Sequence, residues 1–253
     1  MKQIVDFKVV EKCDFGRSVL LRLRFMQPLP EITPGQFVQV RVDGSPSTYL
    51  RRPISIHDVD FIQNEISLLV QRVGEGTRHL CDVLEGHLIN MVLPLGNGFT
   101  LPNKGDKVLF VGGGIGIAPL YYFAKVLNEK GIRPTLLLGG KSESDLLRLH
   151  DYQQFGETFV TTEDGSLGEQ GFVTQHSMWQ KQGFDKIYVC GPKPMMKAVA
   201  KLATEKQVWC EVSLENLMAC GLGVCLCCVE DTVEGHVCVC KDGPVFNTRR
   251  LKW

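Results

Sequence analysis

Short apolar or alternating runs, separated by turn-forming residues, fill roughly the first 100 residues of the chain. Runs of this length and period are typical of β-strands, and their regular spacing predicts a small antiparallel β-barrel. One helix is expected to interrupt the barrel at 78–84, with Thr77 as its N-cap. The predicted strands are Phe7–Val10, Val19–Phe25, Gln36–Val42, Ile54–Val59 and Glu65–Val70.

After Leu101-Pro102-Asn103 the pattern changes, and strand-like runs alternate with helical ones. Such alternation predicts an α/β domain: a doubly wound parallel sheet with helices on both faces. The predicted strands are Lys107–Val111, Thr135–Leu138, Thr158–Thr162 and Lys186–Cys190, and the predicted helices are Leu120–Asn128 and Lys193–Glu205.

Composition and charge narrow the class of protein. A chain of 253 residues with 44% hydrophobic and 22% charged residues is long enough for two compact domains and a small appendage. Because 28 basic and 28 acidic residues balance, no nucleic acid or anionic membrane is expected as a partner. The N-terminus lacks the apolar run of an export signal, so we expect a cytoplasmic protein with no membrane-spanning segment.

Seven of the ten cysteines are concentrated near the C-terminus. In a reducing compartment they are unsuited to disulfides, which favours metal binding or chemistry. Their gradient marks a separate module, so the expected domains are 1–101, 102–209 and 210–253. The crowded cysteines are Cys210, Cys220, Cys225, Cys227, Cys228, Cys238 and Cys240.

The spacing Cys220-x4-Cys225-x2-Cys228 is that of plant-type [2Fe–2S] ligation, in which a fourth thiolate comes from a distant strand. Gly221 and Gly223 allow the sharp turns that such a loop needs, and small residues let backbone N–H groups point at the sulfurs. A zinc ribbon is the alternative, but it usually has two Cys-x2-Cys knuckles, and this segment has only one plausible pair.

Two further cysteines leave the ligand set open. The x2 spacing favours Cys228 over its neighbour Cys227. If His236–Cys240 is extended, Cys238 and Cys240 lie on the same face of a strand, so periodicity does not choose between them as the fourth ligand.

A glycine-rich loop, Val111–Pro119, lies between a predicted strand and a predicted helix. Its glycines let a diphosphate approach the backbone, and the helix N-terminus offers free N–H groups; tight strand–helix packing alone is the alternative. Pro119 suits a first helical turn but replaces the third glycine of the usual motif. No acid follows the second strand, where Lys141 stands instead, so the choice between NAD and NADP stays open.

A second phosphate-binding candidate is Val73–Thr77, which opens the helix of the barrel domain. Upstream, the guanidinium of Arg52 suits phosphate, and the hydroxyl of Ser55 suits a hydrogen bond to a ring nitrogen. Taken alone, an Arg-Pro sequence is often simply an exposed edge strand.

The order of these motifs resembles the ferredoxin–NADP reductase superfamily. The cysteine segment Met218–Cys228 and the tail Cys240–Phe246 narrow the resemblance to the family of dihydroorotate dehydrogenase B electron-transfer subunits. The motifs that carry it are Arg52-Pro53-Ile54-Ser55, Gly74-Glu75-Gly76-Thr77, Gly112–Pro119 and Cys190-Gly191-Pro192.

The resemblance implies three cofactor sites. In the resemblance, the sequence Asp242-Gly243-Pro244 after the last cysteine supports Cys240, and not Cys238, as the fourth ligand of the cluster. FAD is lined by Arg52, Pro53, Ile54 and Ser55, with Leu69, Val70 and Gln71 nearby and Gly76 and Thr77 at its pyrophosphate. Gly113, Gly114 and Gly116 lie at the NAD pyrophosphate, and Cys190, Gly191 and Pro192 near the nicotinamide. Cys220, Cys225, Cys228 and Cys240 hold the [2Fe–2S] cluster.

The resemblance also implies the function. An FMN-containing catalytic subunit oxidises dihydroorotate, and electrons pass through [2Fe–2S] and FAD to NAD⁺ in de novo pyrimidine (UMP) biosynthesis. Two copies of each subunit form the assembly, and this chain has no dihydroorotate site of its own. No catalytic acid, base or nucleophile is expected, since the six histidines are scattered.

Two other interpretations remain. The same cofactors serve reductase subunits of sulfide dehydrogenase, transhydrogenase or hydrogenase complexes. A non-enzymatic alternative is a zinc-bearing interaction module on a degenerate nucleotide-binding scaffold, which retention of Arg52, Ser55 and both glycine loops disfavours.

Overall fold

The computed structural model describes residues 2–181 and 183–253. Backbone contacts divide them into two compact units. The first comprises the chain up to Gly98, Asn216–Glu230 and His236–Pro244, and the second comprises Phe99–Glu215, Asp231–Gly235 and Val245–Trp253. The division into three domains ending at residues 101, 209 and 253 stays a prediction.

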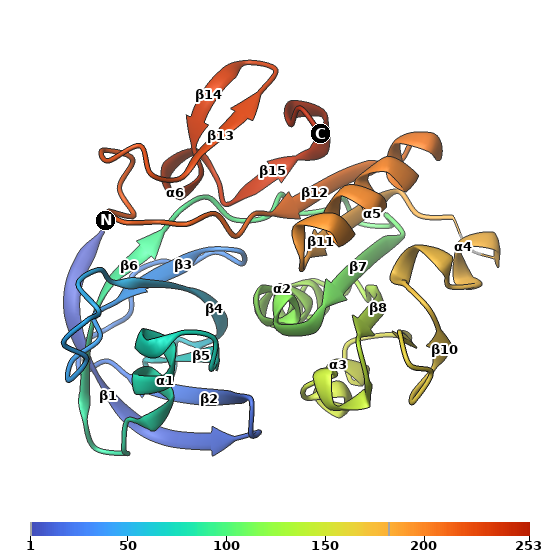
Figure 1. Ribbon diagram of the computed structural model, residues 1–253. Helices are drawn as coiled ribbons and strands as arrows, with labels where there is room; N and C mark the ends of the chain where they lie inside the picture. The colour runs from blue at the N-terminus through green and yellow to red at the C-terminus, as the bar shows by residue number, and fades with distance from the viewer. Residues whose placement is uncertain (1, 182) are drawn as a thin grey trace. The chain divides into compact units, whose positions relative to one another are not determined.

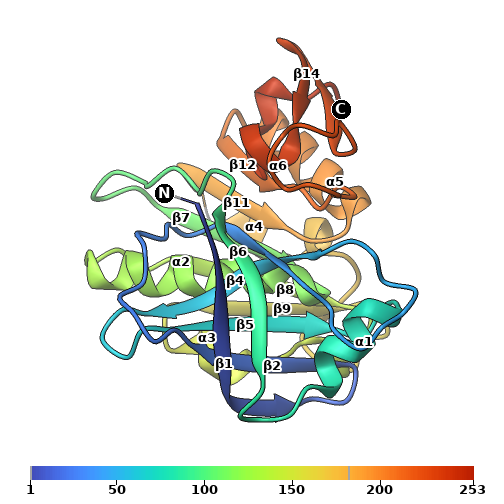
Figure 2. The same ribbon diagram turned by 90° about the vertical axis from the view of Figure 1, so that its left-hand side faces the viewer.

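The first unit contains the predicted antiparallel barrel, closed in the order β1-β2-β5-β4-β3-β6 (Figures 1 and 2). Its sixth strand, β6, was not among the predicted ones. Ile89, Met91 and Leu93 nevertheless alternate into the interior of the barrel and are buried. The strands are β1 (Gln3–Asp14), β2 (Ser18–Arg24), β3 (Phe37–Val40), β4 (Arg52–Asp60), β5 (Glu65–Gln71) and β6 (Leu88–Leu95).

Helix α1 (Glu75–Asp82) follows β5 but begins earlier than expected. The prediction of Thr77 as N-cap is wrong, because Gly74 occupies that position. Thr77 lies in the first turn, where its Oγ1 accepts hydrogen bonds from the N–H groups of Val73 and Gly74, both at 3.0 Å. A side chain that reaches back in this way satisfies donors that the helix leaves free.

The second unit contains the doubly wound parallel sheet, in the order β10-β9-β8-β7-β11-β12-β15. All neighbours are parallel except β15, which pairs antiparallel with β12. The strands are β7 (Val108–Gly113), β8 (Thr135–Gly140), β9 (Thr158–Thr162), β10 (Glu169–Gln170), β11 (Lys186–Cys190), β12 (Trp209–Ser213) and β15 (Val245–Asn247).

Helices cover both faces of this sheet, as predicted: α2 and α3 lie on one side and α4 and α5 on the other (Figure 1). The α-helices are α2 (Ala118–Glu129), α3 (Leu149–Gln153), α4 (Met178–Lys181) and α5 (Lys193–Glu205). Single 3₁₀ turns are η1 (Gly114–Ile117), η2 (Glu143–Asp145), η3 (Val173–Gln175) and η4 (Thr248–Arg250).

Aromatic packing fixes the strands that carry the nucleotide-binding loops. Phe110 of β7 and Phe123 of α2 stack with ring centroids 4.9 Å apart. Tyr188 of β11 packs edge-on against Phe123, also at 4.9 Å. Its hydroxyl donates to the carbonyl of Thr100 at 2.7 Å. Offset and edge-to-face pairs each stabilise the fold by about 1 kcal/mol beyond area burial, so the carboxyl ends of β7 and β11 are firmly positioned.

The cysteine segment ends in small elements: β13 (Val229–Thr232), β14 (Gly235–Cys238) and α6 (Val239–Asp242). The extended conformation considered for His236–Cys240 ends at Cys238, so Cys238 and Cys240 do not share a strand face. The Asp242 carboxylate accepts from the N–H of Cys238 at 2.9 Å and thereby holds the helical turn.

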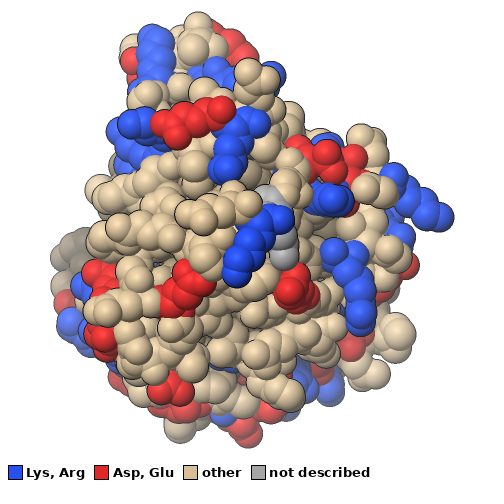
Figure 3. All heavy atoms as spheres, turned by 90° about the vertical axis from the view of Figure 1, so that its right-hand side faces the viewer, with Lys and Arg blue, Asp and Glu red and all other residues tan. Residues whose placement is uncertain are grey.

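Charged side chains of both signs are interspersed on the molecular face shown in Figure 3. Across the described ranges, no helix is both long and apolar enough to cross a bilayer.

Candidate functional site

Two neighbouring strands of the barrel bring the predicted flavin residues together. Arg52–Ser55 begins β4, and Leu69–Gln71 ends β5, which pairs with β4. Leu69 and Val70 are buried, whereas Arg52–Ser55 is only half-buried and presents polar atoms at the barrel surface.

The start of α1 lies directly against Arg52. A Cβ at Gly76 would lie 2.9 Å from Arg52 Nε and 2.9 Å from Thr48 Cγ2. Only glycine therefore lets the guanidinium lie this close to the free N–H groups of the helix. Because both groups favour negative charge, this cradle fits a pyrophosphate.

A serine-rich loop before β4 also lies at the proposed pyrophosphate site. The sequence analysis did not identify this loop. Ser45 Oγ lies 2.7 Å from Thr48 Oγ1 and donates to Glu75 Oε1 at 3.1 Å. Hydrogen bonds from Ser47 and Ser45 lower the pKa of Glu75. The run Gly44-Ser45-Pro46-Ser47-Thr48 is the signal that could have identified it.

The predicted NAD residues lie in two loops that touch each other. They lie at the carboxyl ends of β7 and β11 and directly after them, and these two strands are adjacent and parallel. A Cβ at Gly116 would lie 2.5 Å from Gly191 Cα and 2.6 Å from the Cys190 carbonyl oxygen. Adjacent carboxyl ends of parallel strands are the usual place for a dinucleotide, so the arrangement fits NAD.

Buried groups behind these loops hold them in place. The Tyr152 hydroxyl of α3 donates to the Ile117 carbonyl at 2.8 Å. Cys190 is 1% exposed, and burial raises the pKa of its thiol, which is therefore neutral. The Met195 side chain packs against Gly113, where a Cβ would lie 2.5 Å from its sulfur. Tyr152 and Met195 carry no sequence signal for this role.

The end of β8 has a carboxylate close by, although none follows the strand directly. Lys141 is exposed, and its N–H donates to Asp145 Oδ2 at 3.0 Å. A cation and an anion thus both lie where a ribose hydroxyl or a 2′-phosphate would bind, and the geometry does not separate NAD from NADP.

Backbone amides of the cysteine loop point at its sulfurs. The Leu222 N–H donates to Cys220 Sγ at 3.3 Å. Burial raises the pKa of Cys220, but hydrogen bonds from Leu222 and Cys225 outweigh that effect and lower this pKa to about 6. A thiol that ionises so readily is suited to bind iron.

Two of the three other predicted ligands, Cys228 and Cys240, lie together, while the third, Cys225, is exposed. The Cys240 N–H donates to Cys228 Sγ at 3.3 Å, and Cys240 Sγ accepts from the Gly223 N–H at 3.1 Å. Cys228 is 2% exposed and Cys240 is 0% exposed, while Cys227 is exposed. Thiols that accept amide hydrogen bonds fit an iron–sulfur cluster.

The remaining cysteine behaves differently. The thiol of Cys238 donates to the Gly223 carbonyl at 3.7 Å. Burial raises the pKa of both Cys238 and Cys240, the latter to about 12, so the thiol proton does not distinguish them and the choice of Cys240 as the fourth ligand stays a prediction. The four-cysteine assignment remains a prediction, and no set of three or more His, Cys, Asp or Glu side chains in residues 2–181 and 183–253 is arranged for a single metal ion.

Asn97, just after β6, anchors the segment that follows Cys240. Its Nδ2 donates to the carbonyls of Lys241 and Asp242 at 3.2 and 3.1 Å, and its N–H donates to the Gly243 carbonyl at 2.6 Å. The barrel therefore fixes where the fourth predicted ligand lies.

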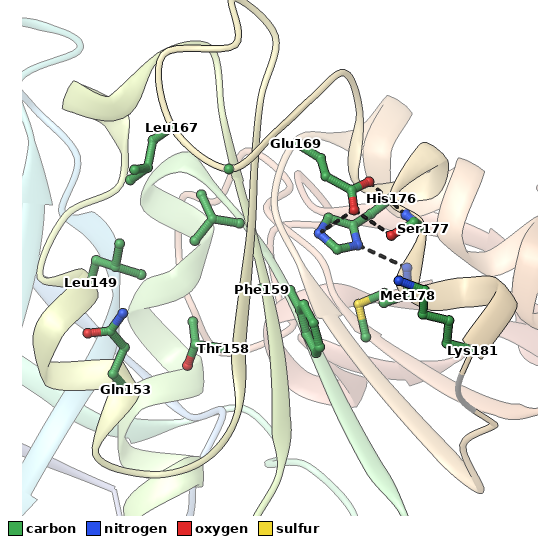
Figure 4. A pocket seen from close by; sticks show the side chains of 12 residues that line it. Leu149, Gln153, Thr158, Phe159, Leu167, Glu169, His176, Ser177, Met178 and Lys181 are labelled. Carbon is green, nitrogen blue, oxygen red and sulfur yellow. Dashed lines mark hydrogen bonds and ion pairs between the residues drawn. The ribbon is translucent and has the colours of Figure 1, made fainter.

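A separate cavity of about 420 Å³ opens beside β9 (Figure 4). None of the predicted site residues lines it. From its rim, Glu169 accepts from the Ser177 N–H at 2.8 Å and lies 3.6 Å from His176 Nε2. These polar groups interact with one another, and the cavity is separate from the predicted cofactor sites.

Comparison with known proteins identifies the modules. Residues 215–252 match the family model for the iron–sulfur cluster binding domain of dihydroorotate dehydrogenase B, and residues 110–201 match the oxidoreductase NAD-binding domain. A solved structure described as an NADH-dependent reduced ferredoxin-NADP oxidoreductase in flavin-based electron bifurcation is similar at 31% identity, with a TM-score of 0.87. The match covers 98% of this chain and 90% of that one. A ferredoxin reductase in carbazole 1,9a-dioxygenase, at 22% identity and a TM-score of 0.69, covering 82% of this chain and 67% of that one, shares the fold.

Curated relatives match over nearly the whole chain. The dihydroorotate dehydrogenase B (NAD(+)) electron transfer subunit of Fusobacterium nucleatum is 41% identical over 222 residues, covering 85% of each chain. The protein of the same name from Bacillus velezensis is 41% identical over 223 residues, covering 86% of each. Identity of this extent shows the family: the chain belongs to the electron transfer subunits of dihydroorotate dehydrogenase B.

Proposed function

We propose that this chain accepts the electrons that a catalytic subunit takes from dihydroorotate and delivers them to NAD⁺, in the pyrimidine pathway of the cytoplasm. The observation that carries the proposal is the cysteine loop, whose sulfurs accept hydrogen bonds from Leu222, Gly223 and Cys240. FAD and a [2Fe–2S] cluster, when bound, supply the redox chemistry: the flavin exchanges a hydride with nicotinamide, and the cluster exchanges single electrons.

On the flavin side the chain's work is binding and orientation. The Arg52 guanidinium and the N–H groups at the start of α1 neutralise the pyrophosphate, and Gly76 lets them approach each other. Ser55 would offer a hydroxyl to the flavin ring, and Leu69 and Val70 are buried, so they exclude water from their part of β5. Pro53, Ile54, Gln71 and Thr77 complete the proposed FAD site.

On the nicotinamide side the two touching loops act as one surface. Gly113, Gly114 and Gly116 hold the pyrophosphate at η1 and α2, and Cys190, Gly191 and Pro192 position the ring. Burial raises the pKa of the Cys190 thiol and keeps it neutral, which makes it a weak nucleophile toward the ring. The relatives' name specifies NAD(+), which favours NAD over NADP here.

The partner is an FMN-containing catalytic subunit, and we propose a heterotetramer of two copies of each. Exposed apolar side chains gather on the cysteine segment: Leu217 is 85% exposed, Val224 77% and Leu226 65%. Apolar groups clustered in this way usually mark a protein interface. An interface there brings the partner to the cluster.

Mutating this surface tests the partner. Leu226→Asp should weaken binding of the FMN subunit at least tenfold in a pull-down or titration, with iron and flavin content unchanged. Ile62→Asp is the matched control, since Ile62 is 88% exposed in the β4–β5 turn of the same unit. Equal binding by both variants would refute this surface.

The function itself is tested by composition and coupling. Anaerobically purified protein should hold about one FAD, two irons and two sulfides per chain. With the FMN subunit it should reduce NAD⁺ when dihydroorotate is added, and alone it should oxidise NADH only with an artificial acceptor. Colourless protein with stoichiometric zinc would refute the proposal.

A second candidate keeps the cofactors and changes the partner. The similarity to a ferredoxin-NADP oxidoreductase over 98% of this chain favours it, since that relative is named for a different reaction. Co-purification of the chain with an FMN protein that oxidises dihydroorotate decides for the pyrimidine pathway; coupling to a sulfide dehydrogenase, transhydrogenase or hydrogenase partner decides against it.

A further inference from the structure

A glutamine of the barrel has a buried side chain without a partner. Gln39, in the middle of β3, is 0% exposed. Neither its Nε2 nor its Oε1 has a hydrogen-bond partner among the described residues. Buried polar groups nearly always have one, and an unpaired carboxamide opposes folding. The side chain therefore needs an explanation outside the protein's own atoms.

The carboxamide lies against the cysteine loop. A Cβ at Gly221 would lie 2.7 Å from Gln39 Cγ and 3.2 Å from Gln39 Nε2. Gly221 has a φ of +69°, which favours glycine. The amide nitrogen is thus next to the residue that follows Cys220, on the side of the loop that faces the barrel.

The backbone around Gln39 holds this position firmly. Its carbonyl accepts from Arg51 Nη1 at 3.3 Å, and β3 pairs with β4 so that Gln39 stands opposite Pro53. Its sequence neighbours Val38 and Val40 are buried. The strand and the buried surroundings therefore restrict where the carboxamide lies, which suits a group that must meet a fixed acceptor.

A cluster at this loop would supply the missing acceptor. Thiolate and sulfide sulfurs bear negative charge, and N–H groups that donate to them raise the reduction potential, because they stabilise the reduced state most. The backbone already directs amides of Leu222 and Gly223 at cysteine sulfurs. Gln39 brings a side-chain amide to the same loop from the barrel.

We propose that Gln39 contacts the iron–sulfur cluster: its amide donates to a sulfur at the Cys220 side of the assembled cluster and raises the reduction potential of the cluster. This inference rests on the proposed function, since it needs a [2Fe–2S] cluster. It goes further by assigning to a residue of the flavin barrel a direct contact with the cluster.

The test compares Gln39→Met, which keeps the shape and removes both polar atoms, with Gln36→Met. Gln36 is the matched control because its Nε2 donates to the Gly96 carbonyl at 2.8 Å and its Oε1 accepts from the Thr33 N–H at 2.9 Å. Both variants are purified anaerobically as full chains with the FMN subunit, and the cluster and flavin are titrated together by EPR and absorbance.

We expect Gln39→Met to bind two irons but to favour the oxidised cluster roughly tenfold more than wild type, which lowers the midpoint by about 59 mV for one electron. Gln36→Met should leave the midpoint unchanged. A loaded Gln39→Met cluster with an unchanged midpoint would overturn the proposal. A shift confined to the flavin would overturn it too, and would instead place the carboxamide at FAD.

A measurement on the wild-type chain guards against a variant that fails to fold. Glutamine labelled with ¹⁵N in the side-chain amide should produce a hyperfine coupling to the reduced cluster in pulsed EPR. Absence of that coupling overturns the proposal. Absence of any iron–sulfur signal from wild-type protein would instead refute the proposed function.

Discussion

Replacing Gly116 by alanine tests whether the two touching loops form the NAD site. The new Cβ would lie 2.5 Å from Gly191 Cα, 2.6 Å from Gly191 N and 2.6 Å from the Cys190 carbonyl oxygen. All three are backbone atoms, so no rotamer change relieves the contact. Carbon atoms pack at about 3.5–4.0 Å, and the loops must therefore separate by about 1 Å.

The magnitude follows from that displacement. Overpacking of a well-packed site costs about 1–3 kcal/mol, which lowers Tm by about 5 °C for a chain of this size. A misplacement of about 1 Å at a reacting group reduces rate about 100-fold, or about 2.7 kcal/mol of activation free energy. We therefore expect kcat/KM for NADH to fall about 100-fold, while FAD and iron content stay at wild-type levels.

The assay is NADH oxidation with ferricyanide, measured together with the rate of flavin bleaching by NADH in stopped flow. Gly183→Ala is the control, because a Cβ there would meet no atom within 4 Å. If Gly116→Ala reduces its flavin within twofold of the wild-type rate, the loops after β7 and β11 do not jointly bind NADH, and the assignment fails.

Three further expectations follow. Gly76→Ala should weaken FAD binding, because the new Cβ would lie only 2.9 Å from Arg52 Nε and would push the guanidinium away. The measurement is bound flavin per chain, and full retention of flavin would contradict the proposed pyrophosphate site. Asn97→Ala loses two side-chain hydrogen bonds, costs about 2 kcal/mol and should lower iron content, as checked by iron analysis and urea unfolding. In apo-protein, Cys220, with its pKa lowered from 9.0 to about 6, should react with iodoacetamide with a midpoint near pH 6. The thiolate contribution to stability is then complete above the unfolded pKa and disappears as pH falls through about 6; a reaction midpoint near 9 would contradict this.

The sequence predicted those elements whose ends are set by neighbouring residues in the chain. The predicted strands Thr158–Thr162 and Lys186–Cys190 and the helix Lys193–Glu205 have the predicted boundaries. In each, an apolar or helical pattern is bounded by turn-forming or charged residues. Helix α1 begins earlier than predicted, because Thr77 lies in its first turn and accepts a hydrogen bond from the Gly74 N–H. The sequence alone does not show whether such a threonine is the N-cap or a residue of the first turn.

Elements fixed by distant contacts could not be predicted. Strand β15 is three residues long and exists because it pairs with β12. The helical turn that contains Cys240 depends on the Asp242 carboxylate and on Asn97 far away in sequence. Gln39 was visible only as a polar residue in an apolar strand, and nothing in the sequence shows that Gly221 covers it.

The order in which the chain contributes to its two units has a practical consequence. After Glu215 the chain returns to the first unit, leaves it for Asp231–Gly235, returns again and finishes in the second. A fragment that stops at residue 209 would lose almost all of β12 together with β15, and would expose the edge of β11 to pairing with other chains. Limited proteolysis or gene splitting would accordingly yield aggregation-prone halves, whereas fusion partners attached at either terminus leave the interleaved segments covalently intact.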